Sequence, residues 1–104
     1  MAKTNRPELA PFDASDYLDS EEVIAEYLAG ALEDPDPDAF LAAVSDVAKA
    51  RGMTDVAAHA GLGRESLYKA LRPGAQPRFD TVRRLLTALG VRLDVVATAQ
   101  ETKR

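Results

Sequence analysis

Four side chains that can bind nucleic acid follow the glycine at position 61. They are Arg64, Glu65, Tyr68 and Lys69. Their spacing puts them at the start and along one exposed side of a helix expected over residues 64–71. Arginine can pair with guanine and glutamate can accept a hydrogen bond from cytosine, whereas tyrosine and lysine can touch phosphate or a thymine methyl group. The pattern therefore predicts a DNA-reading surface.

Two short helices have to position these side chains. Thr54 can cap a helix that runs to Ala60, and Gly61 supplies a left-handed turn before the helix over 64–71, which ends ahead of Pro73. This arrangement predicts a helix-turn-helix. The residues expected to contact DNA are Thr54, Arg64, Glu65, Ser66, Tyr68, Lys69, Arg72 and Arg78. An ordinary helical hairpin with a solvated basic face is the alternative.

Three longer helices are expected around this pair. The first spans residues 20–32 and is capped by Asp19, with Glu22 three residues on as in a capping box. The second spans 37–51, between a cap at Asp36 and the terminating Gly52, and the third spans 79–90. Together they predict an all-α, five-helix bundle that buries the inner faces of the helix-turn-helix.

A short β-strand is expected after the last helix, because residues 91–96 alternate apolar and polar side chains. A lone strand cannot satisfy its own backbone groups. We expect it to pair with the same segment of a second copy, making a homodimer through Val91, Leu93 and Val95. Pairing with the N-terminal arm near Phe12 is the alternative.

The chain is divided by these patterns into four parts. Residues 1–18 form an extended arm, 19–90 the helical domain, 91–98 the dimerisation strand and 99–104 a flexible tail. The length of 104 residues is that of one domain. The sequence has no cysteine, no secretory signal and no apolar run long enough to span a bilayer. We therefore expect a cytoplasmic protein without a membrane partner.

Charge is distributed unevenly. Residues 1–50 hold three basic and twelve acidic side chains, a net charge of −9, whereas residues 51–104 hold ten basic and five acidic ones, a net charge of +5. Such asymmetry is typical of an acidic arm joined to a nucleic-acid-facing unit, although a solvated acidic face would produce it too.

No catalytic or metal-ligating constellation is found. His59 is the one histidine, and without cysteine a metal would need carboxylates around it that the local sequence does not offer. Ser66 has no base at a useful spacing, and the glycines at 61 and 63 make no phosphate-binding loop. We expect neither an enzyme nor a cofactor.

Several runs resemble one family, the addiction-module antidote proteins, which are antitoxins with a phage-repressor (Xre) type helix-turn-helix. The runs are Phe12-Asp13, Tyr17-Leu18-Asp19, the paired prolines 35 and 37, Ala50-Arg51-Gly52-Met53, residues 61–71 and Leu89-Gly90-Val91-Arg92-Leu93. The resemblance covers residues 12–96, and its most specific part is 64–71. Gly63 departs from it, because serine or threonine is expected there as the helix cap.

The resemblance implies a protein that neutralises a small basic toxin of the RelE/HigB type and represses their shared promoter. A stand-alone phage-type repressor without a toxin, and a protein-interaction module that has lost DNA binding, are the alternatives. An acidic segment with an apolar stripe, within residues 12–45, is suited to cover a basic toxin. The candidate contacts are Tyr17, Glu22, Val23, Glu26 and Tyr27. Equally, the stripe can simply pack onto the bundle.

Overall fold

The structure, a computed structural model, describes residues 20–98, and within them the fold is all-helical. It contains α2 (Glu21–Leu32), α3 (Pro37–Arg51), α4 (Met53–Ala60), α5 (Arg64–Leu71) and α6 (Phe79–Ala88). These bounds confirm the five expected helices to within two residues at each end. The expected extended arm, with Phe12 and Tyr17, the expected cap Asp19 and the expected tail lie outside the described residues.

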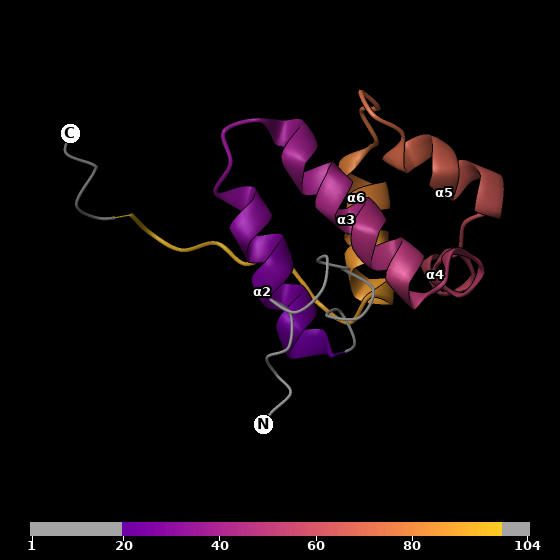
Figure 1. Cartoon of the computed structure of the whole chain (residues 1–104), viewed down its shortest axis with the longest axis horizontal. Helices are drawn as coiled ribbons and strands as arrows, with labels where there is room; N and C mark the ends of the chain where they lie inside the picture. Colours follow the sequence, from indigo (N-terminus) through magenta and orange to yellow (C-terminus); the bar gives the residue numbers. More distant parts are fainter. Residues whose placement is uncertain (1–19, 99–104) are drawn as a thin grey trace, which may run out of the picture.

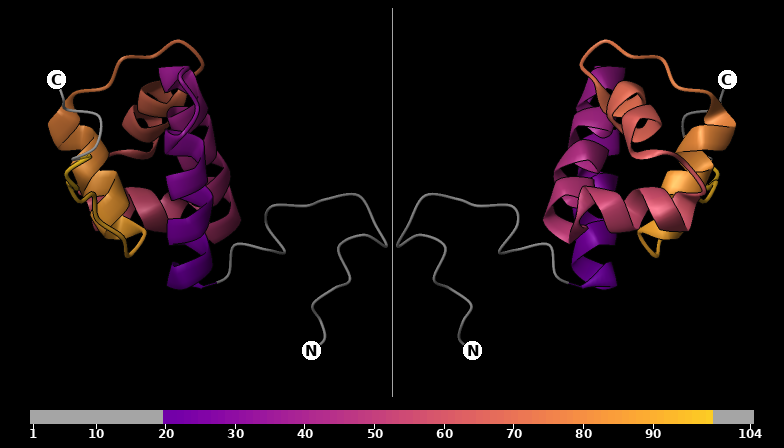
Figure 2. Two further views of the ribbon diagram at one scale, coloured as in Figure 1. Left: turned by 90° about the vertical axis from the view of Figure 1, so that its left-hand side faces the viewer. Right: turned by 90° about the vertical axis from the view of Figure 1, so that its right-hand side faces the viewer.

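The helices form a bundle with α2 and α5 at opposite ends, as Figure 1 shows. Helix α2 packs along α3, while α4 contacts α3, α5 and α6. The two side views in Figure 2 show α6 on the side of the bundle away from α2 and α3. The central side chains exclude solvent almost completely, and the largest of them are Ile24, Val44, Val47, Leu67, Leu85 and Leu86.

Helix α2 begins at Glu21, one residue later than expected. Ser20 is the cap, since it has extended backbone angles (φ −134°, ψ 154°) and its Oγ accepts a hydrogen bond from the Val23 amide at 3.2 Å. The prediction that Asp19 caps this helix in a capping box with Glu22 is therefore wrong. Helix α3 starts as expected, with Asp36 accepting from the Asp38 amide at 2.9 Å and Pro37 in the first turn.

Helix α4 also begins differently, because Gly52 alone connects it to α3. Gly52 has φ +103°, a conformation that residues with a Cβ rarely adopt. The chain turns at this one residue, so the new helix starts at Met53 and has no side-chain cap. Thr54 is thus the second residue of α4, and the prediction that it caps the helix is wrong.

Helix α6 ends at Ala88, two residues earlier than expected. Gly90 adopts φ +84°, and the Val91 amide donates to the Leu86 carbonyl at 3.0 Å. Residues 91–98 then form neither helix nor strand. Figure 1 shows this segment passing α2 and running away from the bundle. No strand therefore forms within the described part of the single chain, and pairing between two copies stays a prediction.

The helices between residues 20 and 98 are too short or too polar for any of them to cross a membrane.

Candidate nucleic-acid interface

A tight turn at Gly61 sets the direction of α5. Gly61 adopts φ +72°, its amide donates to the Ala58 carbonyl at 3.2 Å, and the Leu62 amide donates to the Ala57 carbonyl at 2.9 Å. These two bonds form the Schellman motif, which ends a helix and turns the chain sharply. Leu62 packs against the core and anchors the turn. Only three residues, 61–63, therefore separate the end of α4 from the start of α5.

Helix α5 buries one side and exposes the other. Leu67 and Leu71 enter the core, with exposed fractions of 0% and 6%. Its solvent side carries Arg64, Glu65, Ser66, Tyr68 and Lys69, all of which are exposed. Five of the eight residues expected to contact DNA thus lie together on one short helix. Gly63 precedes this helix and offers no side-chain cap.

Arg64 and Tyr68 are paired on the exposed side of α5. The Arg64 Nη2 donates to the Tyr68 hydroxyl at 3.2 Å, and the Arg64 Cζ lies 5.4 Å from the centre of the tyrosine ring. Residues four apart on a helix are neighbours, and a guanidinium is attracted to an aromatic face. The pair was not anticipated from the sequence, although its i,i+4 spacing was visible there.

The other expected contacts flank α5. Thr54 is exposed in the first turn of α4, next to Met53, which lies in the same groove as Tyr68. Arg72 and Arg78 are exposed at the two ends of the loop between α5 and α6. That loop opens with a turn in which the Ala75 amide donates to the Arg72 carbonyl at 2.9 Å. Proline and then a glycine with φ +81° at its two central positions are typical of a type II turn.

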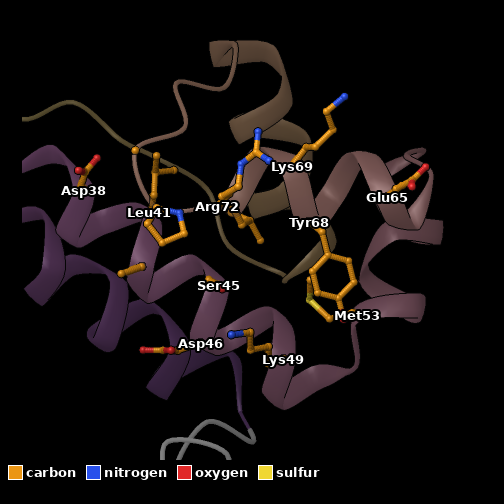
Figure 3. Close-up of a pocket in the computed structure, with 14 residues that line it drawn as sticks. Asp38, Leu41, Ser45, Asp46, Lys49, Met53, Glu65, Tyr68, Lys69 and Arg72 are labelled. Carbon is orange, nitrogen blue, oxygen red and sulfur yellow. The ribbon is translucent and has the colours of Figure 1, made fainter.

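A groove of about 630 Å³ separates α5 from α3 (Figure 3). From α3 it is lined by Asp38 and Asp46 together with Lys49, and from α5 by Tyr68 and Lys69. Figure 3 shows Lys69 pointing away from the groove, whereas the Tyr68 ring lies on its Met53 side. The whole lining holds three acidic and three basic side chains, namely Asp38, Asp46 and Glu65 with Lys49, Lys69 and Arg72. The groove therefore has no excess of positive charge to attract phosphate, so the outer side of α5 is the better candidate for contact with a nucleic-acid backbone.

A second basic surface lies on α6 and was only partly anticipated. Arg83, Arg84 and His59 line a shallow groove of about 520 Å³ beside the Gly61 turn. Arg84 forms an ion pair with Asp80 at 3.8 Å, and the His59 Nδ1 lies 2.8 Å from the Asp55 carbonyl oxygen. Phe79, at the start of α6, is 65% exposed. This surface extends the positive charge from α5 towards α6.

The acidic face of α2 lies at the other end of the bundle. Glu22 and Glu26 are exposed, whereas Ile24 and Leu28 are buried and Val23 is half-buried against the core. The alternative interpretation of the apolar stripe, that it packs onto the bundle, therefore applies to Ile24 and Leu28. Among the described candidates for toxin contact, the two glutamates are the most accessible.

Tyr27 is held within the chain, because its hydroxyl donates to the Asp46 Oδ2 on α3 at 2.7 Å. Burial raises the pKa of Tyr27 to about 12, and the hydrogen bond and negative charge of Asp46 add to the rise. This contact joins α2 to α3 across 19 positions of the sequence. Tyr27 thus has a structural partner as well as its expected place in a toxin surface.

The expected dimerisation residues differ in exposure. Val91 packs against the core, whereas Leu93 is 40% exposed and Val95 is 94% exposed. Leu93 borders a small groove of about 220 Å³ that Leu28 and Leu32 of α2 also line. Within residues 20–98, no group of three or more histidines and carboxylates is arranged to hold a metal ion.

Comparison with known proteins adds two findings. A family model described as "Probable addiction module antidote protein" matches residues 8–97. An uncharacterized protein of Haemophilus influenzae is 40% identical over 88 residues, which is 85% of this chain and 91% of that protein. No solved structure matches the chain.

Proposed function

Since the chain belongs to the family of probable addiction module antidote proteins, we propose that it is an antitoxin that also represses its own promoter by binding DNA. Membership of this family implies a toxin partner. The toxin we propose is a small basic protein of the RelE/HigB type. The second part of the proposal is repression of the promoter, which requires the outer side of α5 to bind DNA.

The observation that carries DNA binding is the single exposed face of α5. Arg64, Tyr68 and Lys69 share it, while Leu67 and Leu71 hold the helix on the core. An α-helix with its side chains is about 10–12 Å in diameter, close to the width of about 12 Å of the B-DNA major groove. The geometry supports insertion of α5 as the recognition helix of a helix-turn-helix.

The surroundings of α5 supply the positive charge that phosphate binding needs. Residues 61–90 hold six basic side chains and two acidic ones, a net charge of +4. Arg72 and Arg78 flank α5, and Arg83 and Arg84 continue the charge along α6. Contacts from such residues position a protein on the duplex without reading its sequence. In this proposal the hydroxyl groups of Thr54 and Ser66 also contact the sugar-phosphate backbone of the DNA.

The acidic end of the bundle suits a basic toxin. Residues 20–38 hold seven acidic side chains and no basic one. Glu22 and Glu26 are exposed there, and Leu32 is 51% exposed at the end of α2. Opposite charges accelerate the encounter of two proteins, and an exposed apolar side chain provides area to bury. Because α2 and α5 lie at opposite ends, one molecule can hold toxin and DNA together (Figure 1).

The proposal is tested by titrating labelled promoter DNA from the chain's own operon and following fluorescence anisotropy. A base-shuffled duplex of equal length is the control. We expect preferential binding of the promoter, with an affinity that falls linearly on a log–log plot against salt concentration. No binding at low salt would leave only a protein-interaction module, and equal binding of the two duplexes would contradict recognition of a specific promoter sequence.

Toxin capture is tested separately. The neighbouring reading frame is expected to encode a small basic protein, which should co-purify with this chain and lose its toxicity. Promoter binding without such a neighbour would instead favour the stand-alone repressor.

A further inference from the structure

Residues 91–95 read symmetrically about their centre. Leu93 stands between Arg92 and Asp94, and a valine lies outside each of them. When two copies of such a segment run antiparallel about a twofold axis through the central residue, each residue lies opposite the residue that is equally far from the centre in the other copy. Apolar residues would then face apolar residues, and each arginine would face an aspartate.

The segment is accessible for such pairing. Val91 still packs against the bundle, but the exposed fraction rises to 40% at Leu93 and 94% at Val95. These three residues share one side of an extended chain. The apolar side of this segment therefore packs against the molecule's own core at Val91 and is exposed to solvent at Leu93 and Val95. Val96 is 77% exposed as well, and such a run of exposed apolar residues needs a partner to cover it.

The charges select one register. With Leu93 opposite its own copy, Arg92 lies opposite Asp94 of the second chain and the reverse pair forms on the other side of the axis. Moving the axis to Arg92 puts two arginines directly opposite each other, and moving it to Asp94 does the same with two aspartates. Like charges at directly opposed positions destabilise a sheet. An axis between two residues would mix apolar and polar side chains on each face.

The backbone amides are compatible with this register and indicate which residues would form the hydrogen bonds. The Val91 amide already donates to the Leu86 carbonyl at 3.0 Å, and the Val95 amide donates to the Asp94 Oδ1 at 2.9 Å. Within residues 20–98, the amides of Arg92, Leu93 and Asp94 have no acceptor. In an antiparallel ladder only alternate residues exchange hydrogen bonds with the partner strand. A ladder made by Arg92 and Asp94 uses two of these three unbonded amides and leaves the bonded amides of Val91 and Val95 undisturbed.

We infer that residues 91–95 pair antiparallel with the same residues of a second copy, with Leu93 on the twofold axis and two Arg92–Asp94 ion pairs across it. The pairing rests on the proposed function, because helix-turn-helix repressors bind two half-sites as dimers, and it assigns the surface and register of that dimer. Val95 is covered by Val91 of the other copy. Leu93 also lines a groove of about 220 Å³ together with Leu28 of α2.

The test exchanges the charges. In Arg92→Asp two aspartates of one chain face two of the other, and in Asp94→Arg four arginines meet in the same way. Each variant alone should raise the dimer dissociation constant about tenfold or more. An equimolar mixture should form a heterodimer, because every cross-strand pair is then Arg–Asp. The double variant Arg92→Asp/Asp94→Arg should dimerise like the original chain.

Analytical ultracentrifugation, without DNA or toxin, measures the original chain, the two single variants, their mixture and the double variant. Arg83→Asp is the matched control, because it makes the same change of charge on α6 beside α4, away from this segment. It should leave dimerisation unchanged. Circular dichroism checks that each variant keeps its helices.

Three results would overturn the inference: an original chain that is monomeric at high micromolar concentration, single variants that dimerise normally, or a mixture that stays monomeric. A dimer with these properties that fails to bind promoter DNA would instead count against the proposed function alone. The two failures are therefore distinguishable.

Discussion

The Arg64 guanidinium lies against the Tyr68 side chain, with its Nη2 3.2 Å from the phenolic oxygen and its Cζ 5.4 Å from the ring centre. Both side chains are exposed, so this contact is not a consequence of core packing. It restricts the rotamers of a long side chain that would otherwise move freely in solvent. The guanidinium has five N–H donors and uses one here, which leaves the others available for a base.

Tyr68→Phe should weaken promoter binding by about 0.5–1.5 kcal/mol, because the ring remains but the hydrogen bond that holds Arg64 is lost. The same substitution in an Arg64→Ala background should have almost no effect, since the two residues act together. Anisotropy titrations of the four proteins complete the double-mutant cycle. Equal losses in both backgrounds would mean that the Tyr68 hydroxyl contacts DNA by itself.

Arg64→Ala together with Lys69→Ala should abolish promoter binding and leave toxin capture intact, because the two proposed surfaces lie at opposite ends of the bundle. Loss of the arginine alone should cost about 1–3 kcal/mol. Lys49→Ala is the control, since Lys49 lies on α3 across the groove from α5 and should not affect DNA binding. If the folded double variant lost both activities, the separation of surfaces would be refuted.

Gly63→Ser should stabilise the fold. Gly63 caps α5 with extended angles (φ −71°, ψ 154°) but provides no oxygen, and nothing lies within 4 Å of a Cβ built there. Serine fits this conformation and can accept from an amide of the first turn. We expect the free energy of unfolding of Gly63→Ser to exceed that of Gly63→Ala by about 1 kcal/mol in urea denaturation. Equal stabilities would show that no cap forms.

Tyr27 should make the fold sensitive to alkali. Its pKa is about 12 in the folded chain against 10.0 for the free side chain, because burial and Asp46 disfavour the phenolate. A group whose pKa is raised on folding contributes fully below its unfolded pKa and loses that contribution as pH rises through the folded value. Stability linked to Tyr27 should therefore decline between pH 10 and about 12.

Tyr27→Phe tests this linkage. At neutral pH it should lower the free energy of unfolding by about 1 kcal/mol or less, because the hydrogen bond is solvent-accessible. Between pH 10 and about 12 the difference from the original chain should shrink. Urea denaturation across this range measures it, with Tyr68→Phe as the control for loss of a tyrosine. If the difference in the free energy of unfolding stayed constant from pH 10 to about 12, the ionisation of Tyr27 would not be the cause of the loss of stability.

The helices could be predicted from the sequence because their apolar spacing agrees with the core they build. Ile24 and Leu28, or Leu85 and Leu86, recur at helical spacing and are in fact buried. The caps at Asp19 and Thr54 were predicted wrongly for a local reason. Either residue type can cap a helix, and the choice depended on the angles of Ser20 and Gly52, which the pattern does not encode.

The candidate site was predictable only where it is local. Exposure of Arg64 and Lys69 follows from the burial of Leu67 on the same short helix. The Tyr27–Asp46 contact and the groove between α3 and Tyr68 depend on how α2 and α5 pack against α3, and helical spacing contains no information on that packing. The C-terminal segment shows a strand pattern, but no partner strand is present among residues 20–98.

The one-residue connection at Gly52 limits how the length of this protein can change. Each residue added to a helix rotates the rest of the chain about the helix axis by about 100°. An insertion between Arg51 and Met53 would thus swing α4 and, with it, the outer side of α5. The loop over residues 72–78 has no such constraint and can lengthen at little entropic cost. Natural variation in chain length should therefore accumulate after Leu71 and be missing at Gly52.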